Sequence, residues 1–306
     1  MTPNKSLPAE LQTLRDVIRW GMTQFTRAEL FYGHGTDNAL DESTRLVLHA
    51  MGVPPGGEQL ALDARLTEVE KQQLNTLIQR RIEERMPLPY LTGVAWFAGL
   101  PFKVNQSVLI PRSPIAELIE HGFQPWLGDL EPHSILDLCA GSGCIGIACA
   151  HLFTEAKVDL AELSTEALLL AQQNVQQHQL DDRVHCWQSD LFNAVKGLRY
   201  DLIVSNPPYV DKADLQSMPA EFQHEPAMAL ASGEDGLDIT RRILREAAGH
   251  LNESGLLVVE VGNSGMALEE AYPAVAFTWL EFERGGHGVF VFSRKELEQY
   301  QQQFSD

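Results

Sequence analysis

The hydrophobic pattern from about residue 112 onward alternates between short apolar runs and segments of helical periodicity. Short apolar runs of this kind are typical of strands buried in a parallel sheet. Their alternation with helices predicts an α/β fold with a doubly wound, mostly parallel sheet and one antiparallel strand at the end. The expected strands are Ile135–Cys139, Lys157–Leu163, Val184–Ser189, Tyr200–Ser205, Leu256–Val261, Thr278–Phe282 and Val289–Phe292.

The chain up to Gly93 has a helical pattern instead. Asp41 is the expected N-cap of a helix that runs through Met51, and Thr67–Glu70 fits a capping box. Apolar residues recur at helical spacing in two sets, which are Leu7, Leu11, Leu14 and Ile18, and Leu74, Leu77, Ile78 and Ile82.

A short hairpin is expected between the two patterns, formed by Trp96–Val104 and Val108–Ile110. We therefore divide the chain into a helical domain over residues 1–93, a β-hairpin linker over 94–111 and an α/β domain over 112–306. Two domains are also what the length of 306 residues predicts.

The charge is distributed unevenly along the chain. Up to Gly93 there are 10 basic and 12 acidic residues, and from Val94 onward 13 basic and 30 acidic. Seven acids and one lysine lie between Asp211 and Asp238. This excess is either a solubility charge or a field that repels phosphate and attracts a basic partner. Both interpretations disfavour naked nucleic acid as a substrate.

Location and redox state follow from what the sequence lacks. No apolar stretch approaches the roughly 20 residues of a membrane span. Met1–Ser6 lacks a basic segment followed by an apolar one, so we expect no secretory signal. The four cysteines show no CxxC spacing and are expected to be reduced, without a metal site, in a cytoplasmic protein.

The most informative stretch is Asn206-Pro207-Pro208-Tyr209, which directly follows the apolar run at Tyr200–Ser205. Two prolines forbid both strand continuation and an immediate helix, so the chain is held in a stiff turn. This turn lies at the carboxyl end of a strand, where open α/β sheets bind ligands. An amide side chain, a backbone carbonyl and an aromatic face there can hold one planar –NH2 group.

A glycine-rich loop follows the first expected strand, running from Asp137 through Cys139 to Gly141, Gly143 and Gly146. It matches G-x-G-x-x-G, which makes a dinucleotide dehydrogenase a rival interpretation. However, the Asp137 carboxylate suits a cationic amino acid group better than a pyrophosphate. S-adenosylmethionine therefore fits better than a nicotinamide cofactor.

The loops after the next strands supply further candidate cofactor contacts. Glu162, followed by Leu163, is expected on the ribose hydroxyls, and Asp190 with Leu191 and Phe192 near the adenine. The alternatives are a surface charge for Glu162 and a loop cap for Asp190.

As a set, these motifs resemble the class I adenosylmethionine-dependent methyltransferases, and more narrowly the protein-(glutamine) methyltransferases of the HemK/PrmC and PrmB group. The similarity covers essentially the whole chain, although Glu162 stands where many relatives have aspartate. Tyr32–Asn38 and Pro111–Ile115 resemble the PrmB branch. That resemblance implies methylation of a glutamine in large-subunit ribosomal protein number three, and a release-factor glutamine is the alternative.

The resemblance also implies roles for the parts of the chain. The Asn206 side-chain oxygen and the Pro207 carbonyl would accept the two N–H groups of the substrate amide, and Tyr209 would pack against the amide or shape the slot. The helical domain would recognise the substrate, with Tyr32–Asn38 either a recognition loop or a capped loop. A nucleic-acid adenine methyltransferase would need a basic groove. A non-catalytic assembly factor would not need the intact turn at Asn206.

Overall fold

The computed structural model describes residues 6–54 and 56–305; Met1–Lys5, considered above for a secretory signal, lie outside them. The chain forms two compact units. The helical unit contains the chain up to Ala95 together with Pro219–His224, and the sheet unit contains Trp96–Met218 and the chain from Glu225 onward. Pro219–His224 falls inside the range 112–306 expected for the α/β domain, yet it packs with the helices.

The helical unit is built on long amphipathic helices around one core. Thr67 caps the longest helix, and the expected capping box with Glu70 is confirmed. Val17, Phe25 and Leu46 are fully buried in the core, as are Leu74 and Ile78. The helices are α1 (Leu14–Arg27), α2 (Ala39–Ala50), α3 (Glu58–Ala61), α4 (Glu68–Glu83) and α5 (Leu88–Thr92).

Two sequence predictions about helix starts were wrong. Leu7 and Leu11 precede α1, because Thr13 forms a capping box with Asp16 and starts the helix at Leu14. The N-cap of α2 is Asn38 rather than Asp41, since the Asn38 side chain accepts a hydrogen bond from the Asp41 N–H. Asn38 is the N-cap because an N-cap side chain accepts the N–H of the third residue after it, and Asp41 occupies that third position.

The hairpin is shorter than expected. It consists of β1 (Val94–Phe97) and β2 (Leu100–Lys103), joined by a two-residue turn at Ala98 and Gly99. Both turn residues have positive φ, 46° and 74°, which matches the twist of a tight hairpin. Val108–Ile110 is not a strand; the Ile110 N–H instead donates to the Glu225 carboxylate at 2.9 Å.

The seven expected strands of the α/β domain are all present in one sheet, so the predicted fold class is confirmed. The sheet order is β5-β4-β3-β6-β7-β9-β8, and β9 is antiparallel to both of its neighbours. The neighbours from β5 to β7 pair in parallel. The strands are β3 (Ser134–Leu138), β4 (Lys157–Glu162), β5 (Val184–Gln188), β6 (Tyr200–Ser205), β7 (Leu251–Glu260), β8 (Thr278–Trp279) and β9 (Val289–Ser293).

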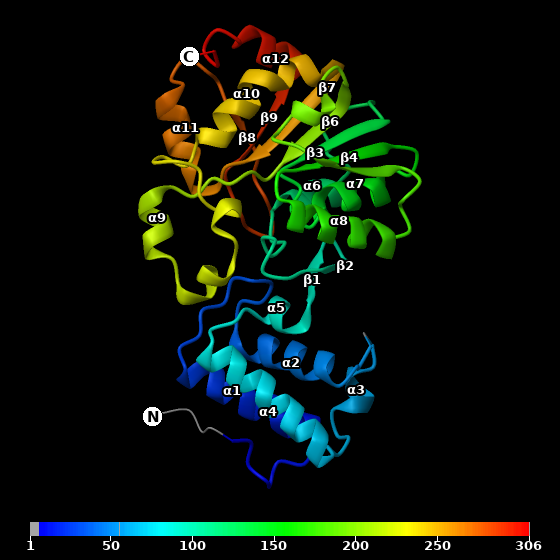
Figure 1. The fold of residues 1–306 in the computed structure, drawn as a ribbon, viewed down its shortest axis with the longest axis vertical. Coiled ribbons are helices and arrows are strands. Elements are labelled where there is room, and N and C mark those ends of the chain that lie inside the picture. The colour runs from blue at the N-terminus through cyan, green and yellow to red at the C-terminus, as the bar shows by residue number, and fades with distance from the viewer. Residues whose placement is uncertain (1–5, 55, 306) are drawn as a thin grey trace. The chain divides into compact units, whose positions relative to one another are not determined.

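Helices cover both faces of this sheet (Figure 1). Along β6, Leu202 and Val204 pack on one side, and Ile203 packs on the other. The first side is covered by α6 (Ile115–Glu120), α7 (Cys144–Leu152) and α8 (Thr165–Gln177), and the second by α10 (Asp238–His250), α11 (Gly265–Ala271) and α12 (Arg294–Gln299). The remaining short elements are α9 (Lys212–Ser217) and the 3₁₀ turns Asn193–Val195, Ala220–His224, Ala227–Ala229 and Gly262–Ser264.

Within the described ranges, no helix combines the length and the apolar character that crossing a membrane requires.

Candidate active site

The carboxyl ends of β3, β4 and β6 meet around one pocket. β3 lies between β4 and β6, so the chain leaves β3 toward one side and returns through β6 on the other, which is the switch point where open sheets bind ligands. The pocket has a volume of about 260 Å³ and lies within the sheet unit. Seven of the predicted site residues line it, namely Cys139, Gly141, Glu162, Leu163, Asp190, Leu191 and Asn206.

The backbone around this pocket is held in left-handed conformations. Gly141 and Gly143 have φ of 55° and 79°, and Gly143 is the N-cap residue of α7. Cys139 and Leu191 also have positive φ, 59° and 51°, although neither is glycine. Such conformations cost a non-glycine residue of order 1–2 kcal/mol and gather at functional sites. Gly143 itself does not line the pocket.

Asp137 lies beneath the loop, fully buried, and does not line the pocket. Its Oδ2 accepts the Gly146 N–H at 2.8 Å. Its Oδ1 is buried and has no hydrogen-bond partner among the described residues. Burial raises the pKa of Asp137 to about 7; the nearby charge of Glu162 adds to the rise and the Gly146 hydrogen bond opposes it. An unpartnered oxygen on a poorly solvated carboxylate fits a cationic ligand.

Replacing Gly146 with alanine is expected to destabilise the protein by about 1–3 kcal/mol. A Cβ at this position would meet Leu160 Cδ2 at 2.3 Å and Asp137 Cβ at 3.0 Å. Urea unfolding measures the loss. Gly249→Ala in α10 is the matched control, since a Cβ there meets nothing within 4 Å and alanine favours a helix. Equal midpoints for the two variants would contradict the packing described here.

Glu162 is a bonded carboxylate rather than a surface charge. It is 9% exposed, its Oε2 accepts the Gly141 N–H at 2.9 Å, and its Oε1 accepts the Ser164 N–H at 2.8 Å. Both oxygens retain a lone pair for a ligand hydroxyl.

The loop after β5 carries the three residues expected beside the adenine. Asp190 and Leu191 line the pocket, and Phe192 does not. Asp190 forms an ion pair with Arg242 at 2.8 Å, and its side chain is half-exposed. Phe192 does not lie in the pocket, contrary to the sequence prediction. It is buried and its ring stacks on His250.

The Asn206 turn presents one unsatisfied acceptor. Asn206 lines the pocket, and its Oδ1 is buried without a hydrogen-bond partner in the described part of the chain. Pro208 also lines the pocket, whereas Pro207 is buried and does not. A buried oxygen without a partner is costly, so a ligand N–H is the natural complement.

Tyr209 lies behind the turn rather than in the pocket. Its hydroxyl donates to Glu260 Oε1 at 2.9 Å, and its carbonyl accepts from Ser264 Oγ at 2.7 Å. Its ring leaves no room for a Cβ at Gly262, which would come within 2.6 Å. Of the two roles expected from the sequence, these contacts fit shaping the slot and not packing against the substrate amide.

Comparison with known proteins identifies the family. Residues 123–235 match the methyltransferase small domain, and residues 16–93 match the PrmC N-terminal domain. The chain is 47% identical over 295 residues to "Ribosomal protein uL3 glutamine methyltransferase" of Francisella tularensis, covering 96% of this chain and 94% of that protein. It is 48% identical over 288 residues to the protein of the same name from Xanthomonas campestris, covering 94% and 93%. The chain belongs to the uL3 glutamine methyltransferase family.

Solved structures agree on the fold of this family member. The hMettl16 catalytic domain in complex with MAT2A 3'UTR hairpin 1 superposes with a TM-score of 0.51 at 17% identity, covering 79% of this chain and 85% of that one. This level of likeness concerns the fold alone.

Sequence reasoning from composition and spacing missed a second wall of the pocket in this methyltransferase. Arg112 donates to both carboxylate oxygens of Glu225, at 2.6 and 2.8 Å, and the pocket is lined by Pro111, Arg112 and Ser113 on one side of this pair and by Pro226 next to Glu225. Only the family resemblance pointed to Pro111-Arg112 and Glu225-Pro226. The two partners are 113 residues apart, so no local pattern predicts their contact.

The acidic stretch at Asp211–Asp238 is partly neutralised in the structure. Glu221 and Glu225 are buried and bonded to arginines. Glu234 pairs with Lys212, and Asp235 pairs with Arg241. These four acids, of the seven in this stretch, are therefore paired with basic residues of the chain itself. This weakens the argument that the stretch exists to attract a basic partner.

Proposed function

We propose that this chain transfers the methyl group of S-adenosylmethionine to the side-chain amide nitrogen of a glutamine in ribosomal protein uL3, large-subunit protein number three. The observation that carries the proposal is the buried, unpartnered Asn206 Oδ1 in the pocket. The names of the relatives supply the substrate.

S-adenosylmethionine is the proposed cofactor, because methyltransferases of this family and fold generally use it. Asp137 Oδ1 would accept from the ammonium group, and Glu162 would accept from the ribose hydroxyls. Leu163, Asp190 and Leu191 would border the nucleoside. Cys139 and Gly141 line the pocket, and the open space around Gly141 would let the ligand approach the backbone closely, while Gly143, also expected at the cofactor, would support the loop from behind.

The chemistry needs a held nitrogen rather than a strong base. Bound S-adenosylmethionine supplies an electrophilic methyl group. Asn206 Oδ1 and the Pro207 carbonyl would accept the two N–H hydrogens of the glutamine amide and stabilise the positive charge that develops on its nitrogen. Transfer of the methyl group would leave S-adenosylhomocysteine as the other product, and the nitrogen would lose one of its two hydrogens as a proton to water. Holding the nitrogen in line in this way can lower the barrier by about 7–11 kcal/mol. Tyr209, fixed to Glu260, would keep the turn in place.

The helical unit is proposed as the part that recognises uL3.

The charge of the remaining chain also suits this partner. Ribosomal proteins are typically basic, and the chain from Val94 onward carries the acidic excess. We place the reaction in the cytoplasm.

The test is transfer of labelled methyl from S-adenosylmethionine to three acceptors in parallel: uL3, a release factor and duplex DNA. We expect label on uL3 alone. Label on the release factor alone would move the chain to the alternative glutamine substrate. Label on DNA alone would show that the charge argument against nucleic acid is wrong.

A further inference from the structure

A loop that follows the catalytic turn leaves the sheet unit and returns to it. Its two ends are joined, since the Val210 N–H donates to Leu230 O at 2.8 Å and the Ser232 N–H donates to Val210 O at 3.1 Å. Its tip, Pro219–His224, packs with the helical unit. Directly after the tip, the loop supplies part of the pocket wall, through Pro226, Met228 and Ala229. The helical unit therefore holds the segment from which this wall begins.

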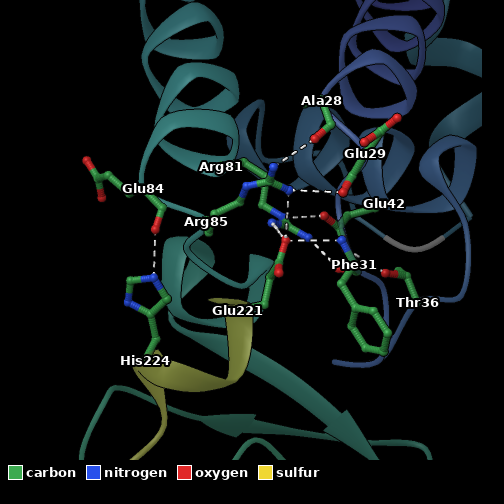
Figure 2. A network of polar contacts seen from close by, with 10 residues as sticks. All are labelled: Ala28, Glu29, Phe31, Thr36, Glu42, Arg81, Glu84, Arg85, Glu221 and His224. Carbon is green, nitrogen blue, oxygen red and sulfur yellow. Dashed lines mark hydrogen bonds and ion pairs between the residues drawn. The ribbon is translucent and has the colours of Figure 1, made fainter. Parts of the chain in front are cut away.

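One buried carboxylate anchors the tip. Glu221 is 2% exposed, and its Oε1 accepts the Phe31 N–H at 3.1 Å and Arg81 Nη1 at 3.2 Å (Figure 2). Burial alone would raise the pKa of Glu221, but these hydrogen bonds outweigh it and the pKa is lowered. The carboxylate is thus charged at neutral pH, and Arg85 Nη1 also lies 3.5 Å from its Oε1.

Arg81 connects this anchor to the helices. It is 1% exposed, its Nε donates to Glu42, and its Nη2 donates to Phe31 O at 2.9 Å. Thr36 donates to the other oxygen of Glu42 at 2.7 Å, as Figure 2 shows. Without Glu221, Arg81 would keep Glu42 and Phe31 O as partners. Loss of Glu221 should therefore release the tip while Arg81 keeps its other hydrogen bonds.

Ring contacts and a backbone contact complete the seat of the tip. Phe222 packs on Phe31 at 5.5 Å and on His34 at 4.5 Å between ring centroids. His224 Nε2 lies 2.7 Å from Glu84 O. The sequence left two roles open for Tyr32–Asn38. In the structure, His34 of this stretch packs against Phe222 of the tip, and Asn38 caps α2.

We propose that Glu221 and Arg81 are positioning residues for methyl transfer. They fix the tip in the helical unit, while Arg112 and the Ile110 N–H fix Glu225 in the sheet unit. The short stretch between these two anchors sets where the wall at Pro226–Ala229 begins. Because the tip and this wall are consecutive in the chain, we infer that releasing the tip loosens the wall at Pro226–Ala229, which contains none of the residues assigned to the cofactor.

The test combines kinetics with hydrogen exchange on the full chain; its kinetic part rests on the proposed function. For Glu221→Ala we expect kcat/KM for uL3 to fall about ten- to hundred-fold, as for a misplaced acceptor. S-adenosylmethionine affinity should stay within about two-fold, because the residues assigned to it lie in the sheet unit. Amide exchange should speed up over residues 219–231 and stay unchanged in β3 and β6. Glu221→Gln keeps an acceptor oxygen and should lose less activity than Glu221→Ala. It therefore provides a second, folded variant of intermediate activity if the alanine variant misfolds.

Glu234→Ala is the matched control, an exposed acid of the same acidic stretch paired with the exposed Lys212; it should behave as the parent. Unchanged kcat/KM in the Glu221 variants, or unchanged exchange over residues 225–231, would overturn the proposal. Should the parent itself fail to methylate uL3, the proposed function fails, and the exchange measurement still decides whether Glu221 anchors the wall.

Discussion

Asn206→Ala is expected to lower kcat by a factor on the order of 10³ or more while leaving S-adenosylmethionine affinity nearly unchanged. Asn206 Oδ1 is the buried, unpartnered acceptor of the pocket, and an amide nitrogen is a poor nucleophile unless it is held. Removing that acceptor removes both the orientation of the nitrogen and the stabilisation of its developing charge. Single-turnover methyl transfer and calorimetric cofactor titration measure the two effects separately.

The matched control for this prediction is Asn193→Ala. Asn193 is an exposed residue in the 3₁₀ turn Asn193–Val195 and does not line the pocket. It should retain the parent activity. Near-normal turnover by Asn206→Ala would show that the amide nitrogen is held by other groups, and the mechanism proposed here would be wrong.

Asp137→Asn is expected to weaken S-adenosylmethionine binding about ten- to hundred-fold, the value of a charge-assisted hydrogen bond. The asparagine oxygen can still accept the Gly146 N–H, so the loop should keep its shape. The NH2 group of asparagine then takes the position of Oδ1, so both the negative charge and the acceptor for the ammonium group are lost. Equilibrium binding of the cofactor to both proteins measures the difference, and equal affinities at pH 8 would remove Asp137 from the cofactor site.

The same residue predicts a pH dependence with a definite sign. A cationic ligand binds the ionised carboxylate, so affinity in the parent should fall as the pH drops below about 7, the pKa of Asp137. Without ligand, the folded pKa is higher than the unfolded value, so the stability that Asp137 contributes is present at low pH. It is lost as the pH rises from about 4 through about 7. Asp137→Asn should flatten both profiles, and an unaltered slope in thermal unfolding against pH would contradict this assignment.

The strands and the glycine-rich loop after β3 could be predicted because their signals are local. Apolar runs such as Tyr200–Ser205 predict buried strands by themselves, and their alternation with helices predicts a mostly parallel sheet, whereas the order of β4, β3 and β6 comes from the structure. Glu162 and Asn206 could therefore be placed at strand ends from the sequence alone. The structure brings both to one pocket, as expected from parallel strands.

The contacts that support the site could not be predicted, because their partners are far apart in the chain. Glu221 entered the sequence analysis only as one acid in an acidic stretch, yet its partner Arg81 lies 140 residues away. For Tyr209 the sequence leaves two roles open, packing against the amide or shaping the slot, because nothing in it shows that Glu260 accepts the Tyr209 hydroxyl. The helical spacing of apolar residues extends to Leu7 and Leu11, on the N-terminal side of Thr13. The capping box at Thr13 nevertheless starts the helix at Leu14.

The central claim is that the acceptor is an amide nitrogen held by Asn206. The most direct measurement is fragmentation mass spectrometry of uL3 after incubation with S-adenosylmethionine and either the parent or Asn206→Ala. We predict one added methyl group, located on a glutamine side chain, with the parent and none with the variant. A methyl group on a lysine, an arginine or the main chain, or equal modification by both proteins, would contradict the account.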